Sequence, residues 1–267
     1  MNSILRQMKR VPIVGLTLGI VLLTGCTATE NVGGNHAATS TVSGTTSADS
    51  TGQRTNSPLG FQFDMPQTGE QIVVINTSMG VIKARLFPND APQTVANFEG
   101  LVGEKYYDGS IFHRVINDFM IQGGKPASGA EKSFSGQPLP LEVNDNLRNF
   151  RGSLAMARTS DPNSAESEFF INQNPTVTAD TFTQYGASGY QVSNLSDAVK
   201  TMYEQHGGNP FLDDDCAAPG SRGYAVFGQV FDGMDVVDKI ASASVDSNDQ
   251  PLTAITMTSV TLETYEG

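Results

Sequence analysis

The residue types that most often carry chemistry are few in this sequence. It contains two cysteines, Cys26 and Cys216, and three histidines, which leaves little room for a zinc site or a disulfide framework. Acidic side chains are more numerous, and aspartates occupy all of 213–215. Metal binding by this run is one alternative, but no supporting ligand cluster lies nearby in the sequence. We interpret the run as solvated and expect neither a metal nor a cofactor.

Three blocks place single polar side chains among aromatic and small apolar residues. Residues 112–124 read Phe-His-Arg-Val-Ile-Asn-Asp-Phe-Met-Ile-Gln-Gly-Gly. The second block has two parts, Gly-Ser-Leu-Ala-Met-Ala-Arg at 152–158 and Glu-Phe-Phe-Ile-Asn at 168–172. The third reads Gly-Tyr-Ala-Val-Phe-Gly-Gln-Val at 223–230 and leads into Asp-Gly-Met-Asp-Val-Val-Asp-Lys-Ile at 232–240.

The blocks resemble, in content and order, those of the cyclophilin-type peptidyl-prolyl cis-trans isomerases, over about residues 70–263. That resemblance implies catalysis of rotation about X–Pro bonds. Resonance gives the amide C–N bond partial double-bond character, so uncatalysed rotation crosses a barrier of ~18–20 kcal/mol. A fixed guanidinium aimed at the prolyl nitrogen would localise its lone pair and lower that barrier in a dry groove. Such a reaction requires no nucleophile and no metal.

By this resemblance Arg114 is the catalytic group, and His113 is structural. A proline pocket of apolar side chains, the Gln122 amide for the substrate carbonyl, and a strip that holds the substrate backbone complete the implied site. The residues that match these substrate contacts are Phe119, Met120, Gln122, Ala157, Arg158, Glu168, Phe170, Phe211, Leu212 and Tyr224.

Four of these positions depart from the common family pattern. Arg158 stands where many members have asparagine, and Tyr224 stands where the family has histidine. Glu168 replaces the usual glutamine, and we expect its carboxylate near Arg114, either orienting the guanidinium or competing with substrate for it. Phe211 aligns with a tryptophan of many members, and its alignment crosses a long insertion at about 176–209.

The first 25 residues resemble a lipoprotein signal peptide. Arg6, Lys9 and Arg10 precede the uncharged run 11–23, which is too short to span a bilayer. The sequence Leu-Thr-Gly-Cys at 23–26 resembles a bacterial lipobox, which implies a lipid on Cys26. We therefore expect an extracytoplasmic protein held to a bacterial membrane by acyl chains such as palmitate.

Residues 26–64 are predicted to be a flexible tether, because they are mostly Ser, Thr, Gly and Asn and offer little apolar surface to bury. The body, 65–267, is long enough for one sizeable core. Two β-rich runs at 72–75 and 81–87 predict a hairpin. A helix is predicted from Pro92 to Gly103, with a capping side chain at 89–90, and a second over 234–240.

Further short β-rich runs are predicted at 111–115, 119–122, 153–157, 169–172, 225–230 and 255–262. Within the insertion, Ser196 could cap a helix that ends at Gly207. With the resemblance, these elements indicate a mainly β fold. We expect a closed antiparallel eight-stranded cyclophilin-like barrel, capped by two helices and carrying an extra helical insertion.

The composition excludes one class of partner. With 28 acidic and 16 basic residues the net charge is −12, so the chain is a poor binder of nucleic acid. We expect a monomeric isomerase that assists the folding of secreted or surface proteins and binds proline-containing polypeptides. The alternative is a non-catalytic chaperone or adhesion module on the same fold. A solute-binding lipoprotein is disfavoured because alternating strand and helix units are absent.

Overall fold

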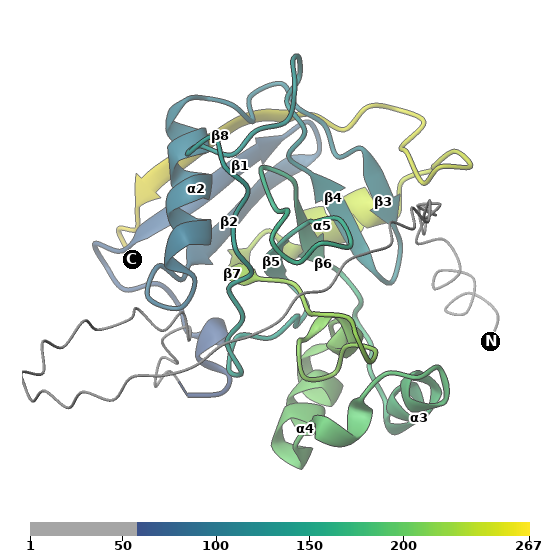
Figure 1. Ribbon diagram of the computed structural model, residues 1–267. Helices are drawn as coiled ribbons and strands as arrows, with labels where there is room; N and C mark the ends of the chain where they lie inside the picture. Colours follow the sequence, from purple (N-terminus) through teal and green to yellow (C-terminus); the bar gives the residue numbers. More distant parts are fainter. Residues whose placement is uncertain (1–57) are drawn as a thin grey trace, which may run out of the picture. The chain divides into compact units, whose positions relative to one another are not determined.

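The computed structural model describes residues 58–267, which form a curled, mainly β structure with helices on its outside (Figure 1). The elements agree with the predicted strands and with both predicted capping helices to within a few residues. In chain order they are η1 (Phe61–Phe63), β1 (Gln71–Thr77), β2 (Gly80–Leu86), α2 (Pro92–Gly103), β3 (Arg114–Ile116), β4 (Met120–Gly123), β5 (Ser153–Met156), β6 (Phe169–Asn172), α3 (Ala179–Ala187), η2 (Val192–Asn194), α4 (Asp197–His206), η3 (Pro210–Leu212), β7 (Val226–Asp232), α5 (Met234–Ala241) and β8 (Met257–Thr264).

The eight strands form one antiparallel sheet in the order β3-β4-β6-β5-β7-β2-β1-β8. The expected closed barrel is wrong, because the sheet is open between β3 and β8. Strand β3 has only three residues, and the chain before it meets the approach to β8 through a single bridge, Ile111 with Thr256. Val115 on β3 donates to the carbonyl of Asp249, in a loop, so no ladder closes the sheet.

One face of the sheet packs on the main core with α2 and α5. The strands alternate, since side chains of successive residues point to opposite faces. Leu154, Ile171 and Phe227 lie in this core, whereas their sequence neighbours Ala155, Phe170 and Val226 lie in a second cluster. The alternation of side chains along each strand therefore places the buried core on one face of the sheet and a separate apolar cluster on the other.

Helix α2 begins as predicted at Pro92, but its cap is different. No side chain from 89–90 caps it; instead the Glu142 carboxylate accepts the N–H groups of Gln93 and Thr94, at 3.1 and 2.7 Å. A carboxylate at a helix N-terminus satisfies free N–H groups and meets the positive end of the helix dipole. The cap comes from 49 residues away and is invisible to local pattern.

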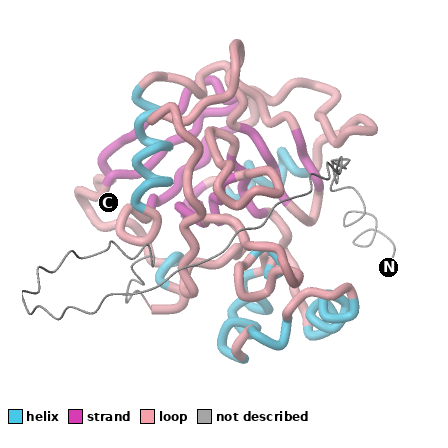
Figure 2. The backbone as a smooth tube through the Cα atoms, in the orientation of Figure 1, coloured by secondary structure: helices cyan, strands magenta, loops and turns pink. Residues whose placement is uncertain are grey.

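The insertion folds as a helical unit beside the sheet (Figure 2). Helix α4 has the predicted boundaries: the Ser196 hydroxyl accepts the Val199 N–H, and Gly207 ends the helix with a φ of 75°. Helix α3 is not predicted; the side chains of Thr178 and Thr181 cap it reciprocally. Its Phe182 packs with residues of α4 in a third apolar cluster.

The chain packs against the body before its predicted start at Met65. Gln62 is buried and exchanges hydrogen bonds with the backbone of Arg148, at 2.8 and 3.0 Å. On either side of it, Phe61 packs 5.1 Å from the ring of Phe87 and Phe63 stacks 3.9 Å from that of His206. The predicted signal peptide, most of the tether and Cys26 lie outside the described residues.

Candidate active site

A row of side chains crosses the face of the sheet that is turned away from the main core. Arg114 pairs with Gln122, Gln122 with Phe170, and Phe170 with Ala155 in the registers of neighbouring strands. Side chains directly opposite one another on antiparallel strands share a face. The strand register therefore places the guanidinium, the amide and an aromatic ring side by side.

The second apolar cluster surrounds this row. Its buried members include Met120, Phe170 and Leu212, and partly buried rings lie at its border. It gathers every apolar residue predicted for the substrate pocket, namely Phe119, Met120, Ala157, Phe170, Phe211, Leu212 and Tyr224.

The cluster residues that follow the insertion in the sequence contact those that precede it. Phe211, on η3, stacks on Phe119 with ring centroids 5.8 Å apart. The Tyr224 N–H donates to the Leu212 carbonyl at 3.0 Å, and its ring meets Phe170 edge-on at 5.6 Å. The alignment across the insertion thus leads to residues that lie together in space.

Arg114 lies at the edge of the cluster on β3 and is partly exposed. Its Nε lies 3.8 Å from the Asp249 carboxylate, a loose ion pair. Burial lowers the pKa of the guanidinium from its ordinary value, and Asp249 acts in the opposite direction. Arginine remains protonated in proteins, so Arg114 presents a positive charge beside an apolar surface.

Glu168 does not take the place expected for it. Its carboxylate accepts the Gln122 Nε2–H at 2.8 Å and lies 3.2 Å from His113 Nε2 and 3.3 Å from Lys125 Nζ. Burial alone would raise its pKa, but His113, Lys125 and Gln122 outweigh burial and lower the pKa to about 2. The expected pairing of Glu168 with Arg114 is wrong, because these donors hold it and Asp249 pairs with the arginine.

This contact determines how the Gln122 amide is turned. An ionised carboxylate only accepts hydrogen bonds, so Gln122 must direct its NH₂ group toward Glu168. One N–H is used there, and the second N–H of the same group is left for an acceptor on a bound molecule. A glutamine in place of Glu168 would permit either orientation of the amide. Glu168 is therefore a positioning residue for Gln122.

Arg158 holds the loop before β7. Its guanidinium lies 4.5 Å above the Tyr224 ring, a cation–π geometry, and donates to the backbone carbonyls of Thr159, Arg222 and Gly223. The neighbouring Ala157 N–H donates to the Glu168 carbonyl at 2.8 Å. Arg158 therefore positions the Tyr224 ring at the border of the pocket.

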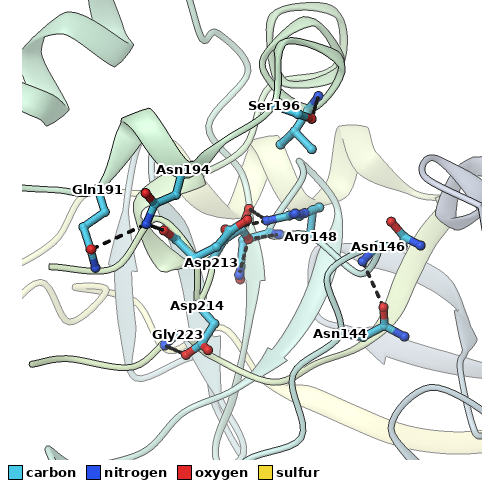
Figure 3. Close-up of polar contacts among 12 residues, drawn as sticks. Asn144, Asn146, Arg148, Gln191, Asn194, Ser196, Asp213, Asp214 and Gly223 are labelled. Atoms are coloured by element: carbon cyan, nitrogen blue, oxygen red, sulfur yellow. Dashed lines mark hydrogen bonds and ion pairs between the residues drawn. The ribbon is translucent and has the colours of Figure 1, made fainter. Parts of the chain in front are cut away.

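The aspartate run 213–215 is predicted to be solvated, and for Asp213 that prediction is wrong. Asp213 is buried, with its carboxylate accepting hydrogen bonds from the Tyr203 hydroxyl at 2.6 Å and from Asn149 at 2.9 Å. Arg148 lies 3.4 Å from Asp213 (Figure 3) and 2.6 Å from Asp215. Burial disfavours the charged Arg148, but the two aspartates outweigh it and raise its pKa.

Two further observations bear on other kinds of chemistry. Cys216 is buried, and burial raises the pKa of its thiol to about 12, so it is not a reactive thiolate. Within residues 58–267, no three His, Cys, Asp or Glu side chains are grouped to hold a metal ion.

Comparison with known proteins gives the family. The family model for cyclophilin type peptidyl-prolyl cis-trans isomerase/CLD matches residues 72–262. This chain belongs to the cyclophilin-type peptidyl-prolyl cis-trans isomerases. A putative peptidyl-prolyl cis-trans isomerase of Staphylococcus aureus is 38% identical over 200 residues, which is 74% of this chain and 94% of that protein.

Two further relatives of this cyclophilin extend the comparison. A putative bifunctional phosphatase/peptidyl-prolyl cis-trans isomerase of Streptococcus pyogenes is 38% identical over 71% of this chain and 38% of its own length. A crystal structure of a Cryptosporidium parvum cyclophilin type isomerase, in the presence of the dipeptide Ala-Pro, has a TM-score of 0.54 and 25% identity, covering 73% of this chain and 99% of that one.

Three residues at the site are missed by sequence reasoning. Asp249 pairs with Arg114 from a loop more than a hundred residues away, and nothing local signals it. Tyr185 and Tyr190, from the insertion, pack on Phe211. For these two a signal exists: the capping pattern at 178–181 precedes a stretch that contains three aromatic residues.

Proposed function

We propose that this isomerase acts on proline-containing polypeptides outside the cytoplasmic membrane, with Arg114 as its catalytic residue. The observation that carries the catalytic part is the row of Arg114, Gln122 and Phe170 on one face of the sheet, at the border of an apolar cluster. It places a positive charge and a free amide N–H beside an apolar surface that suits a proline ring.

The residues divide the reaction between them. The apolar side chains of Phe119, Met120 and Leu212 receive the prolyl ring, which has no N–H to satisfy. The free N–H of Gln122 donates to a carbonyl of the substrate and holds its backbone while the bond turns. Arg114 directs positive charge at the prolyl nitrogen, where lone-pair density rises as resonance with the carbonyl is lost at the twisted geometry.

The direct test is the rate of cis–trans exchange in an X–Pro peptide, followed by NMR with and without the protein. The uncatalysed exchange takes tens of seconds or longer, so catalytic amounts of enzyme are expected to raise the measured exchange rate clearly. A protein that binds the peptide but leaves the exchange rate unchanged would instead be the binding module, a chaperone or adhesion surface on the same fold.

The cellular location rests on the sequence alone. The basic start, the short apolar run and Leu-Thr-Gly-Cys at 23–26 support lipidation of Cys26 and extracytoplasmic attachment to a bacterial membrane. In the described part of the chain, no helix has the length and hydropathy of a membrane span. The clients would then be secreted or surface proteins that fold outside the cytoplasmic membrane. The isomerase would act on them as a monomer joined to its lipid anchor by the predicted tether.

Replacing Cys26 with serine tests the anchor. Since a serine hydroxyl does not accept the lipid that a lipobox cysteine carries, Cys26→Ser is expected to move the protein out of the membrane fraction or leave it as the uncleaved precursor. Cell fractionation and intact-mass measurement give both readouts. Cys216→Ser, in the folded body, is the matched control and should stay with the membrane. An unlipidated Cys26 in the wild-type protein would contradict the proposal.

A further inference from the structure

The insertion contributes an aromatic wall to the border of the proposed substrate pocket. Tyr185, at the end of α3, lies 5.0 Å from the Phe211 ring, and Tyr190 lies 5.3 Å from it, measured between ring centroids. The two tyrosines also touch each other, at 5.9 Å. Phe211 in turn stacks on Phe119. A continuous row of rings therefore runs from the pocket into the insertion.

The two tyrosines have different surroundings. Tyr185 is 2% exposed, so it supports Phe211 from behind. Tyr190 is half-buried, and its ring packs on Phe211 with the two ring planes tilted by 55°. Burial raises the pKa of the Tyr190 hydroxyl, and the nearby Tyr224 raises it further. Tyr190 thus packs on Phe211 at the border of the pocket and remains partly exposed.

The backbone holds Tyr190 in place from both sides. Gly189 has a φ of 92°, and the Tyr190 N–H donates to the Tyr185 carbonyl at 3.1 Å, the bond that closes a Schellman turn at the end of α3. The next residue, Gln191, binds the carbonyls of Cys216 and Ala217 through its N–H and its amide, at 3.0 and 2.8 Å. A ring held in this way loses little conformational freedom when it binds a ligand.

We propose that Tyr190 is a specificity residue of this isomerase, forming with Phe211 a subsite for an aromatic side chain next to the substrate proline. The inference rests on the proposed function, because it assumes that the proline occupies the adjoining apolar cluster. A half-buried, rigid tyrosine beside a phenylalanine offers the amphipathic surface on which aromatic side chains pack. Clients with an aromatic residue on one particular side of the proline are therefore preferred.

The test compares three peptides in the NMR exchange assay with the full chain. One is Ala-Ala-Pro-Ala, and the other two carry phenylalanine immediately before or immediately after the proline. Tyr190→Ala is expected to lower kcat/KM about three- to tenfold for one of the two phenylalanine peptides, the size of one aromatic contact. The alanine peptide should change less than twofold. Tyr190→Phe, which keeps the ring, should resemble the wild type.

Tyr265→Ala is the matched control. Tyr265 is also half-buried and packs on one phenylalanine, Phe231, at 5.6 Å, but it lies outside the pocket cluster. Equal losses on all three peptides would show that Tyr190 only supports the fold around Phe211, and this would overturn the inference. So would no loss on any peptide, or the same selective loss in Tyr265→Ala.

Failure of the proposed function gives a different result. If the wild type accelerates none of the peptides, catalysis is absent. Chemical-shift titration of the same samples then measures the affinity for each peptide and tests whether the subsite exists. In that case, selective weakening of one phenylalanine peptide by Tyr190→Ala would support the subsite, and equal affinities for wild type and variant would refute it.

Discussion

Arg114→Ala is expected to lower kcat/KM for an X–Pro peptide by about 10²–10³-fold, the usual cost of removing one preorganised electrostatic group from an active site. The reason is chemical: Arg114 is the arginine that lies opposite Gln122, and the nearby Lys125 is paired with Glu168, so the charge at the prolyl nitrogen would be lost. Arg114→Lys keeps the charge but not the planar, forked geometry, so an intermediate activity is expected.

The Arg114→Ala variant should fold normally. Arg114 is partly exposed and its ion pair with Asp249 is 3.8 Å long, so its removal costs at most about 1 kcal/mol of folding free energy. Lys83→Ala, which removes an exposed cation paired with Asp232, is the control and should leave activity unchanged. Activity of Arg114→Ala within threefold of the wild type, at an unchanged Tm, would refute the assigned mechanism.

Asp213→Ala is expected to have the largest effect on stability, lowering the free energy of unfolding by about 3–5 kcal/mol. Asp213 is buried, and its removal leaves the Tyr203 hydroxyl and the Asn149 amide without their acceptor. Arg148, itself buried, would keep only Asp215. An uncompensated polar group in the interior costs its full desolvation energy, and here several are created at once.

Urea unfolding of the full chain measures this loss. The control is Asp232→Ala, which breaks an exposed ion pair to Lys83 at 3.2 Å and should cost less than about 1 kcal/mol. Equal stability of the two variants would contradict this role of the Asp213 network, which joins Tyr203 of the insertion to the residue that follows Leu212 of the pocket. Leu212 directly precedes Asp213 in the chain. We therefore expect the Asp213→Ala substitution also to weaken the packing of Phe211 and Leu212 in the pocket.

Several features of the fold follow from local pattern. The alternation of side chains along 120–123 and 169–172 is sufficient to separate Ile121 and Ile171, in the core, from Met120 and Phe170, in the pocket. The capping serine and paired glycines around α4 define that helix without any knowledge of its neighbours. These signals depend only on residues within one or two turns of each other, and the backbone geometry that they select is local as well.

Other features depend on which distant segments meet. The sheet stays open because the short strand β3 hydrogen-bonds to the loop at Asp249 and not along the length of β8. Similarly, Glu168 binds His113 and Gln122 and not Arg114. Neither outcome is visible in the order of residues, since many partners of the right charge are available along the chain.

The sequence by itself determined the family, the strand and helix periods, and the apolar residues that gather in the second cluster. The tertiary structure alone decided the burial of Asp213, the partner of Glu168 and the arrival of Tyr190 beside Phe211. The physical reason is range. Hydrophobic period and capping act over a few residues, whereas ion pairs, buried hydrogen bonds and ring contacts are chosen only when the folded core has fixed which segments are neighbours.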